Sequence, residues 1–457
     1  MSAGRSPPSA GPIRPYAFPS IERRRLSNGV DVRLVSQDTG PVVTGMIVLR
    51  AGETAVTASD SGLAVLTSDA LEGGTARLSS TELARALEDV GASFGAATGW
   101  DSTTVAVSCQ AEHLARAMPL LAQMVRRPAF EQVEFERYRQ QRLATAVQRR
   151  MNPSALAVDA HARFVFADGA TYGRPLGGVE TSLSHLGAED ARGFAAGRYG
   201  PAEAAAVIVG SLDPAEAMAV AEGALGDWYR DIGVSPEPNA RPRSRERAVH
   251  VVNRPGSVQS QIRVGHVGVD RGVDDYFATI VLNLILGGSF SSRLNLNLRE
   301  RRGFTYGVTS SFAPRRGPGP FAVSTAVENA VTGAAIAEIF REIEGIVAAG
   351  PNRDEVETAR NYLAGVFPLR LETTGQIASR VAGMIVYGLA DDYYRTYRDR
   401  VAGVTRADVA AAARRHLRPA ELCTVVVGDA GEVAEQLEGL DIGPVHVHDE
   451  IGPEAGR

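Results

Sequence analysis

The chain has 457 residues, of which 44% are hydrophobic and 22% charged, a balance typical of globular proteins that excludes a wholly disordered chain. Its 48 basic and 53 acidic residues give a net charge of −5, and without a basic excess we do not expect nucleic acid as a partner. No apolar run approaches the ~20 residues that a membrane span requires, and the N-terminal residues show no secretory signal.

The cysteine content indicates where the protein resides. Cys109 and Cys423 are the two cysteines, and each lies in an apolar, strand-like run. Two cysteines cannot build a disulfide framework, so we expect buried free thiols. Together with the composition, this favours a cytoplasmic protein of more than one domain.

The first predicted elements follow residues 1–20, which we expect to be a flexible tail. Asn28-Gly29 stands between two apolar runs and predicts a β-hairpin with a type I′ turn, in which both central residues have positive φ. A strand is predicted over 41–49 and an apolar helix over 62–70. Ser79 and Glu82 predict a capping box at the start of a helix over 82–90.

The middle of the chain predicts further elements: a strand over 103–109, helices over 114–125 and 132–150, a buried strand over 207–210 and a helix from 213 to 226. The stretch 231–246 holds three prolines and several arginines, so we expect a linker that buries little.

The pattern then begins again. Strands are predicted over 249–252 and 260–267, and a long apolar helix over 276–286. The run Thr424–Gly428 repeats the run Val207–Gly210, and Gly428 follows Gly210 by 218 residues. This spacing, close to half the chain, favours a tandem duplication of one α/β unit.

These observations predict five segments. They are a flexible tail (1–20), an N-terminal domain (21–229), a linker (230–247), a C-terminal domain (248–440) and a polar tail (441–457). The histidines His446 and His448 fall in the polar tail, where we expect them to be solvated.

An ordered set of short motifs runs from about residue 22 to about residue 430. The set comprises Ala51-Gly52-Glu53, Gly62-Leu63-Ala64, Gly73-Gly74-Thr75, Glu82–Glu88, Tyr172–Pro175, Val207–Gly210, Gly226-Asp227-Trp228, Leu286–Leu294 and Leu298–Tyr306. Together they resemble the pitrilysin/insulinase family of inverzincin zinc peptidases, in particular its bacterial and mitochondrial-processing-peptidase branch. The resemblance implies an α+β fold of two homologous tandem α/β domains. Each would be a mostly antiparallel sheet flanked by helices, and the two together would form half of a peptidase chamber.

Active members of that family carry His-x-x-Glu-His on the helix after Gly-Leu-Ala. The two histidines bind Zn²⁺, the glutamate activates the metal-bound water, and a further Glu about 77 residues later completes the site. Counted from Gly62, these positions hold Val65, Ser68 and Asp69, and the distal position falls at Ala146. Val65 cannot ligate a metal. We therefore expect no cofactor on this chain, and zinc on a partner subunit.

One weaker metal alternative remains open at this position. Asp69 and Glu72 are carboxylates at i and i+3, a pair that suits Mg²⁺ or Ca²⁺ weakly.

The resemblance also assigns two residues of the C-terminal half. It maps Arg299 and Tyr306 onto the family's Arg/Tyr pair, which faces the catalytic helix and contacts the substrate carbonyl and its oxyanion. Without the resemblance, Arg299 would be one surface charge among several and Tyr306 ordinary strand packing. Gly287-Gly288 has two interpretations, a segment near a substrate entrance or the C-terminal cap of a helix.

The sequence therefore favours a non-catalytic, substrate-binding subunit of a heteromeric zinc metallopeptidase, inactive alone. Its partner would be a zinc-bearing subunit of the same family, and the heterodimer would bind peptides, in part at an exposed strand edge. Two alternatives stay open: a purely structural family member, and a standalone zinc peptidase with a displaced site.

Overall fold

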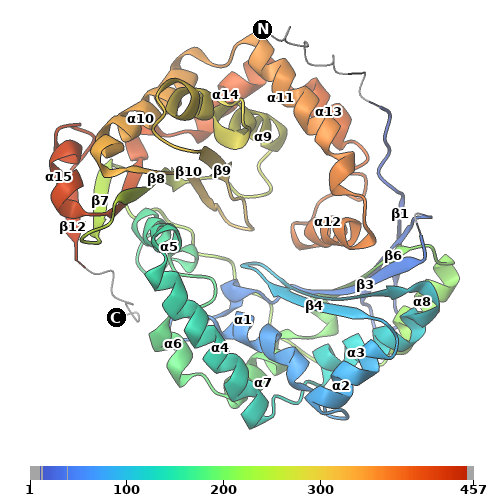
Figure 1. Cartoon of the computed structure of the whole chain (residues 1–457). Coiled ribbons are helices and arrows are strands. Elements are labelled where there is room, and N and C mark those ends of the chain that lie inside the picture. The colour runs from blue at the N-terminus through green and yellow to red at the C-terminus, as the bar shows by residue number, and fades with distance from the viewer. Residues whose placement is uncertain (1–10, 12–13, 39, 450–457) are drawn as a thin grey trace, which may run out of the picture.

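Two six-stranded sheets, one from each half of the chain, form the framework of the computed structural model, which describes residues 11, 14–38 and 40–449 (Figure 1). The strand order is β1-β2-β6-β3-β5-β4 in the first sheet and β12-β7-β11-β8-β10-β9 in the second. Most neighbouring strands are antiparallel, while β2 pairs with β6, and β7 with β11 and β12, in parallel. The expected α+β class with two mostly antiparallel sheets is confirmed.

The first half contains six strands and eight helices among its described residues. The strands are β1 (Ile21–Arg25), β2 (Asp31–Ser36), β3 (Val42–Leu49), β4 (Ser93–Thr98), β5 (Thr103–Gln110) and β6 (Ala204–Gly210). The helices are α1 (Leu63–Asp69), α2 (Ser80–Glu88), α3 (Leu114–Arg126), α4 (Gln132–Met151), α5 (Pro153–Val165), α6 (Glu180–His185), α7 (Ala188–Arg198) and α8 (Pro214–Leu225). The predicted capping box of Ser79 and Glu82 is present at α2.

The second half repeats this plan. Its strands are β7 (Ala248–Asn253), β8 (Gln259–Val267), β9 (Val308–Phe312), β10 (Pro320–Glu328), β11 (Cys423–Gly428) and β12 (Val445–His448). Its α-helices are α9 (Tyr276–Asn283), α10 (Thr332–Ala349), α11 (Arg353–Val366), α12 (Thr374–Val386), α13 (Tyr397–Gly403), α14 (Arg406–His416) and α15 (Ala430–Glu438). Two π-helical turns, Leu284–Gly288 and Asn295–Arg301, follow α9.

The same offset of 218 residues relates whole elements of the two halves. It carries α7 onto α14 residue for residue, and β3 and β5 onto β8 and β10 within one residue at the start. Because the order of five strands also corresponds, and only the edge strands β1 and β12 differ, the tandem duplication extends well beyond the short repeat that predicted it.

Each half covers one face of the other half's sheet with a helix. Apolar side chains of α12 pack on β3 and β6 of the first sheet, and those of α5 pack on β8 and β11 of the second. Figure 1 shows both helices between the two sheets. The two sheets therefore depend on each other for burial of an apolar face.

The N-terminal segment differs from the expected flexible tail over its described part from residue 14. Phe18 is buried, and Tyr16 packs edge-on against Phe367. Arg398 donates hydrogen bonds to the backbone oxygens of Arg14 and Tyr16. The two aromatic rings bury enough apolar surface to hold this Pro-rich segment on the helices of the second half. The rest of residues 1–13, apart from Gly11, lies outside the described residues.

The first hairpin forms as predicted, but with another turn. Gly29 has φ +92°, whereas Asn28 is not among the residues with positive φ. The N–H of Gly29 donates to the oxygen of Leu26, and the N–H of Leu26 donates to the oxygen of Val30. The predicted type I′ turn is wrong, because a three-residue loop with a left-handed glycine needs only one positive φ.

The stretch 231–246 has no helix or strand, but it buries more than we expected of a linker. Its backbone exchanges hydrogen bonds with residues 165–171, and the side chain of Ser235 is buried. Extended proline-rich backbone needs partners for its carbonyl and N–H groups when it lies on the protein, and this strip of the first half supplies them.

The polar C-terminal segment also departs from the expectation. Its residues 445–448 form β12, an edge strand that pairs with β7. His250 and His448 stack on Phe164 of α5, with ring centroids 3.9 and 4.8 Å away, and His446 stacks on His250. His446 is thus exposed as expected although its ring stacks on His250, whereas His448 is half-buried in the ring cluster. Residues 450–457 of the tail lie outside the described part of the chain.

Two further expectations concern burial and membranes. Both cysteines are free and buried, as predicted. Among the described residues, no helix combines the length and the apolar character needed to cross a bilayer.

Candidate functional site

The short helix α1 carries the three motif positions and starts on a buried carboxyl group. Gly62 precedes the helix with φ +94°, and its N–H donates to Oε1 of Glu53 at 2.6 Å. Glu53 is fully buried, and this burial raises its pKa to about 8, against the opposing effects of the Gly62 N–H and of Arg174. Glu53 therefore supports the N-terminus of α1 largely as a neutral acid at pH 7.

The side chains at the motif positions make structural contacts within the protein and do not form a set of metal ligands. Val65 is apolar and buried, and the hydroxyl of Ser68 donates to the backbone oxygen of Val65 at 2.9 Å. Asp69 accepts a hydrogen bond from Nε of Arg142 at 2.9 Å and a second from Nη2. A guanidinium from α4 thus neutralises the one carboxylate that the motif retains.

Zinc does not fit this set of residues. The distal position, Ala146, lies one helical turn beyond Arg142 and has no donor atom. No group of three or more His, Cys, Asp or Glu side chains in the described ranges could hold a metal ion, so the Asp69–Glu72 alternative gains no support. The guanidinium of Arg142 supplies the positive charge beside Asp69. A guanidinium cannot activate a water molecule as a bound metal ion does.

In the second half, Arg299 lies on the π-helical turn Asn295–Arg301. Its guanidinium carbon is 4.3 Å from the ring centre of Phe290, and its Nε is 3.5 Å from the carboxylate of Glu300. Phe290 itself is 64% exposed. The aromatic ring and the carboxylate hold a guanidinium that still faces solvent.

Tyr306 lies in the loop two residues before β9 and is not part of that strand. The amide of Asn295 bonds both the N–H and the oxygen of Val308, which fixes the end of this loop. Gly303 turns the chain with φ +67°, and Tyr306 is 96% exposed. Its phenol is therefore fully available to another molecule.

The glycine pair ends the helical turn Leu284–Gly288, and Ser289 follows it as the cap. Neither glycine has positive φ, so the pair closes the turn without the left-handed residue common at such ends. A Cβ on Gly287 would lie 2.6 Å from the backbone nitrogen of Ser310. This glycine lets the helix approach β9 closely.

The two groups of predicted residues stay separate within the chain. Among the described residues, no hydrogen bond, ion pair or ring contact joins Val65, Ser68 or Asp69 to Arg299 or Tyr306. Sequence reasoning missed Arg142, Glu53 and Phe290. Arg142 had a usable signal, since it stands four residues before the distal ligand position on the same helix face.

Comparison with family models gives two matches that follow one another along the chain. Residues 32–171 match the model described as insulinase, peptidase family M16. Residues 185–363 match the model described as the peptidase M16 inactive domain.

Individual proteins agree with these matches. A protein described as an uncharacterized zinc protease of Streptomyces coelicolor is 25% identical over 75% of this chain and 75% of its own length. YmxG of Bacillus subtilis, also described as an uncharacterized zinc protease, is 22% identical over 79% of this chain and 87% of its own length.

Solved structures show the same fold. The crystal structure of a peptidase M16 inactive domain from Pseudomonas fluorescens superposes with a TM-score of 0.82 at 24% identity, covering 90% of this chain and 98% of that one. A protease from Helicobacter pylori superposes with a TM-score of 0.84 at 18% identity, covering 90% of this chain and 100% of that one.

Proposed function

The chain belongs to the insulinase family of M16 peptidases and lacks the family's zinc motif, and from this we propose that it is the non-catalytic, substrate-binding subunit of a heteromeric zinc peptidase. Its partner in the heterodimer is a zinc-bearing chain of the same family, as in processing peptidases. A cytoplasmic location belongs to the same proposal.

One contrast carries the proposal. The position of the zinc site is closed by the Arg142–Asp69 ion pair, while the Arg/Tyr positions keep a solvent-facing guanidinium and a phenol that is 96% exposed. A solvent-facing arginine that an aromatic ring orients and an exposed tyrosine are groups that a peptide-binding chain would use and a purely structural chain would not need.

The chemistry of the pair suits acyl transfer on a peptide. A guanidinium and a phenol are hydrogen-bond donors, which can hold a substrate carbonyl and stabilise the oxyanion that develops when water attacks it. In this proposal the attacking water is activated on the partner, and this chain contributes donors. The edge strands β4 and β9 have one unpaired side each and suit an extended peptide.

The experiment is reconstitution with a zinc-bearing M16 chain of the same organism, sought first in the neighbouring gene. We expect a 1:1 complex in which the partner carries the zinc and a fluorogenic peptide is cleaved. In that complex, Arg299→Ala and Tyr306→Phe each lower kcat by about 10²-fold, the size typical of losing one oxyanion donor. Arg301→Ala, on the same turn, is the matched control and leaves the rate unchanged.

Two other outcomes identify the alternatives. Stable assembly with full activity of the Arg299 and Tyr306 variants would indicate a purely structural subunit. Stoichiometric zinc on this chain in isolation, with proteolysis to match, would indicate a standalone peptidase.

A further inference from the structure

An open cavity of about 410 Å³ lies between α11 and α13 in the second half, and residues 15–16 of the N-terminal segment line one side of it. Helix α11 contributes residues 360, 361 and 364, and α13 with the turn before it contributes 395, 398, 399 and 402. This spacing places one face of each helix against the cavity. Ala364 and Ala402 have small side chains, which leave the space between the two helices unfilled.

The described wall of this cavity carries more positive than negative charge. Its charged side chains are Arg360, Arg395, Arg398 and Asp399. Among the described residues, none of these four side chains forms an ion pair. The sequence before Arg14 contains no Asp or Glu, so that part of the chain has no carboxylate side chain to offer the three arginines. The wall therefore keeps an excess of about two positive charges.

Neutral backbone oxygens hold two of the arginines in place. The Nη atoms of Arg398 donate to the oxygens of Arg14 and Tyr16, at 3.0 and 3.4 Å. Nη1 of Arg360 donates to the oxygen of Val404 at 3.3 Å. Nε of both arginines is buried without an acceptor in the described part of the chain. The carbonyl groups thus orient two guanidinium groups without neutralising them, and not all of their donors are satisfied.

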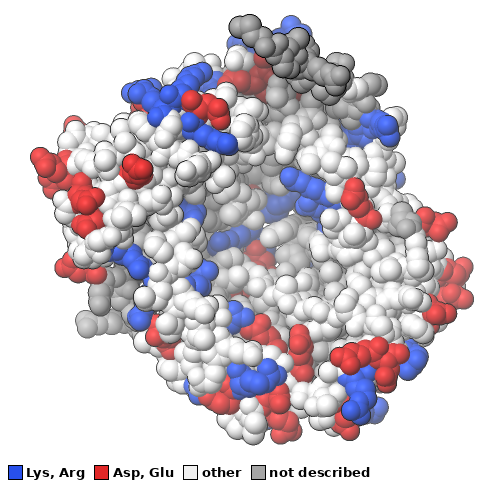
Figure 2. All heavy atoms as spheres, viewed as in Figure 1, with Lys and Arg blue, Asp and Glu red and all other residues white. Residues whose placement is uncertain are grey.

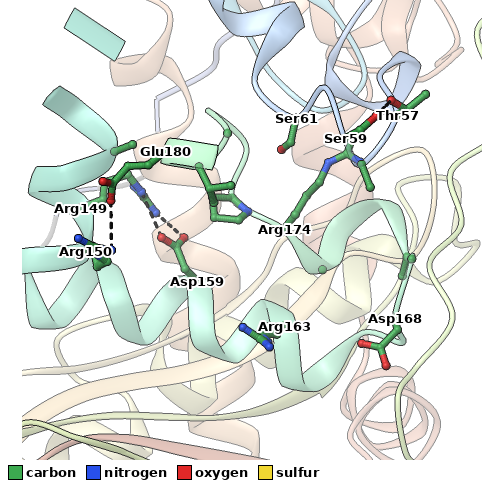
Figure 3. A pocket seen from close by; sticks show the side chains of 18 of the residues that line it. Thr57, Ser59, Ser61, Arg149, Arg150, Asp159, Arg163, Asp168, Arg174 and Glu180 are labelled. Atoms are coloured by element: carbon green, nitrogen blue, oxygen red, sulfur yellow. Dashed lines mark hydrogen bonds and ion pairs between the residues drawn. The ribbon is translucent and has the colours of Figure 1, made fainter. Parts of the chain in front are cut away.

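The larger cavity of about 680 Å³, between α4, α5 and the loop 57–61, differs in this respect (Figure 3). Carboxylates of its own wall neutralise arginines there, in the ion pairs Arg149–Asp159, Arg150–Glu180 and Arg243–Asp168. An incoming anion would have to displace these carboxylates. No such competition exists among the described residues at the cavity between α11 and α13, whose one carboxylate pairs with none of its arginines.

The number and spread of the donors indicate the charge of the ligand. A single phosphate or carboxylate group is matched by the planar fork of one guanidinium. Here α11 and α13 both supply arginine, and the exposed amide of Asn361 adds a neutral donor. The alanines and Pro15 offer little apolar surface for a large hydrophobic body. A compact molecule with several acid groups uses this wall best.

We propose that the cavity between α11 and α13 binds a small polyvalent anion, a compound with two or more phosphate or carboxylate groups held by Arg360, Arg395 and Arg398. Arginine suits both acids, because its fork donates two parallel hydrogen bonds to either. The site does not depend on the proposed subunit role, since none of its residues belongs to the Arg299–Tyr306 group.

The test is calorimetric titration of the full chain with three probes at low ionic strength, where salt screens exposed charges least. Tripolyphosphate and citrate each carry three acid groups of one kind, and inorganic phosphate carries one. We expect 1:1 binding of at least one polyvalent probe, about 10-fold tighter than inorganic phosphate because a second arginine is engaged. The tighter of the two polyvalent probes identifies the acid that the site selects.

Two variants of the wall should shift the affinity in opposite directions. Among the described residues, the side chain of Arg395 makes no hydrogen bond, ion pair or ring contact. Arg395→Gln should therefore weaken the polyvalent probe about 5- to 10-fold and leave the Tm unchanged. Asp399→Asn removes the repulsion of the one carboxylate in the wall and should tighten binding about 3-fold.

Two matched controls report the effect of net charge alone. Arg116 on α3 and Glu88 on α2 are exposed, lie in the other half and form no ion pair among the described residues. Arg116→Gln and Glu88→Gln make the same charge changes as the two wall variants, and they should leave the affinity unchanged.

Three results would overturn the proposal. The first is the absence of binding of both polyvalent probes up to about 1 mM. The second is a polyvalent probe that binds no tighter than inorganic phosphate. The third is an equal effect of Arg395→Gln and Arg116→Gln, or of Asp399→Asn and Glu88→Gln, because this would show a response to net charge without a site.

Discussion

The Asp69–Arg142 ion pair is the residue-scale feature that joins helices α1 and α4. Its side chains are 29% and 23% exposed, so solvent screens the pair only in part. Removing either partner leaves the other charge partly desolvated at the α1–α4 contact. The pair therefore links α1 to α4.

We predict that Asp69→Ala and Arg142→Ala each destabilise the chain by about 1–2 kcal/mol, and that the double variant loses less than their sum. Urea unfolding of the four proteins measures the coupling free energy. The pair Glu189–Arg192, whose acid is 87% exposed, is the control and should show coupling below about 0.5 kcal/mol. Additive losses at Asp69 and Arg142 would contradict the prediction.

Glu53 gives a second residue-scale prediction, on pH. Its pKa is raised to about 8 in the folded chain, whereas the unfolded chain releases this proton near its ordinary value of 4.5. The folded state thus binds more protons between these values, so its stabilisation by neutral Glu53 is complete below pH 4.5 and falls as pH rises toward 8.

Glu53→Gln removes this titration while keeping an acceptor for the Gly62 N–H. We predict that the stability of the variant relative to wild type improves by about 2.5 kcal/mol between pH 5.5 and 7.5. Urea unfolding at the two pH values measures this change. The same difference at both values would show that Glu53 does not hold a proton in the folded chain.

The candidate site was predictable from the sequence only as far as local spacing carries information. Val65, Ser68 and Asp69 could be placed because one helix fixes their relation. The spacing could place Arg142 near the distal motif position on its own helix, but its ion pair with Asp69, 73 residues away, depends on the α1–α4 contact.

At the scale of elements, helices and strands were predicted correctly where the apolar periodicity is strong. They were missed where an element is buried by segments distant in the sequence. Strand β4, with the sequence SFGAAT, has few residues of high strand propensity and forms because β5 pairs with it. Helix α5 was missed because its buried alanines pack on the other half's sheet, so their burial cannot be recognised from neighbouring residues.

The edge strand β12 joins the fold through imidazole rings and gives an element-scale prediction. Burial and the nearby His448, His446 and Arg243 lower the pKa of His250 to about 3, and burial, His446 and Arg163 lower that of His448. The unfolded histidines bind protons near pH 6.5. Stability from neutral docked rings is therefore complete above pH 6.5 and is lost progressively below it.

We predict that His250→Phe, which keeps the stack on Phe164 but cannot titrate, reduces the stability lost between pH 7.5 and 5 by about 2 kcal/mol. Urea unfolding at both pH values measures this loss. His250→Gln is the control: it reduces the pH dependence equally but is less stable than His250→Phe at pH 7.5, because it loses the stack. An unchanged pH dependence in His250→Phe would show that this ring titrates normally.

At the scale of the whole molecule, the exchange of α5 and α12 couples the two sheets across the duplication. The molecule is hollowed between the halves, and basic side chains are visible within the hollow (Figure 2). Since each sheet has one face covered by a helix from the other half, the spacing between the halves is set by packed apolar surface. Two domains joined by a linker alone would be free to change it.

Because each half's sheet is covered by a helix of the other half, a substitution in that helix should destabilise the sheet of the other half. Ala157 on α5 is fully buried against the second sheet, so Ala157→Glu should lose at least about 3 kcal/mol and expose β11 before β6. Ala378 on α12 is fully buried against the first sheet, and Ala378→Glu should expose β6 before β11. Hydrogen exchange of peptides from the two strands measures which strand loses protection first.

Ala157→Gly and Ala378→Gly, which cost about 1 kcal/mol each, give the same comparison if the glutamate variants do not fold. Ala221→Glu on α8, packed in the first half's own core, is the control and should expose β6. If Ala157→Glu instead exposed its own half first, each half would be stable by itself, and the duplicated units would be joined without being interdependent.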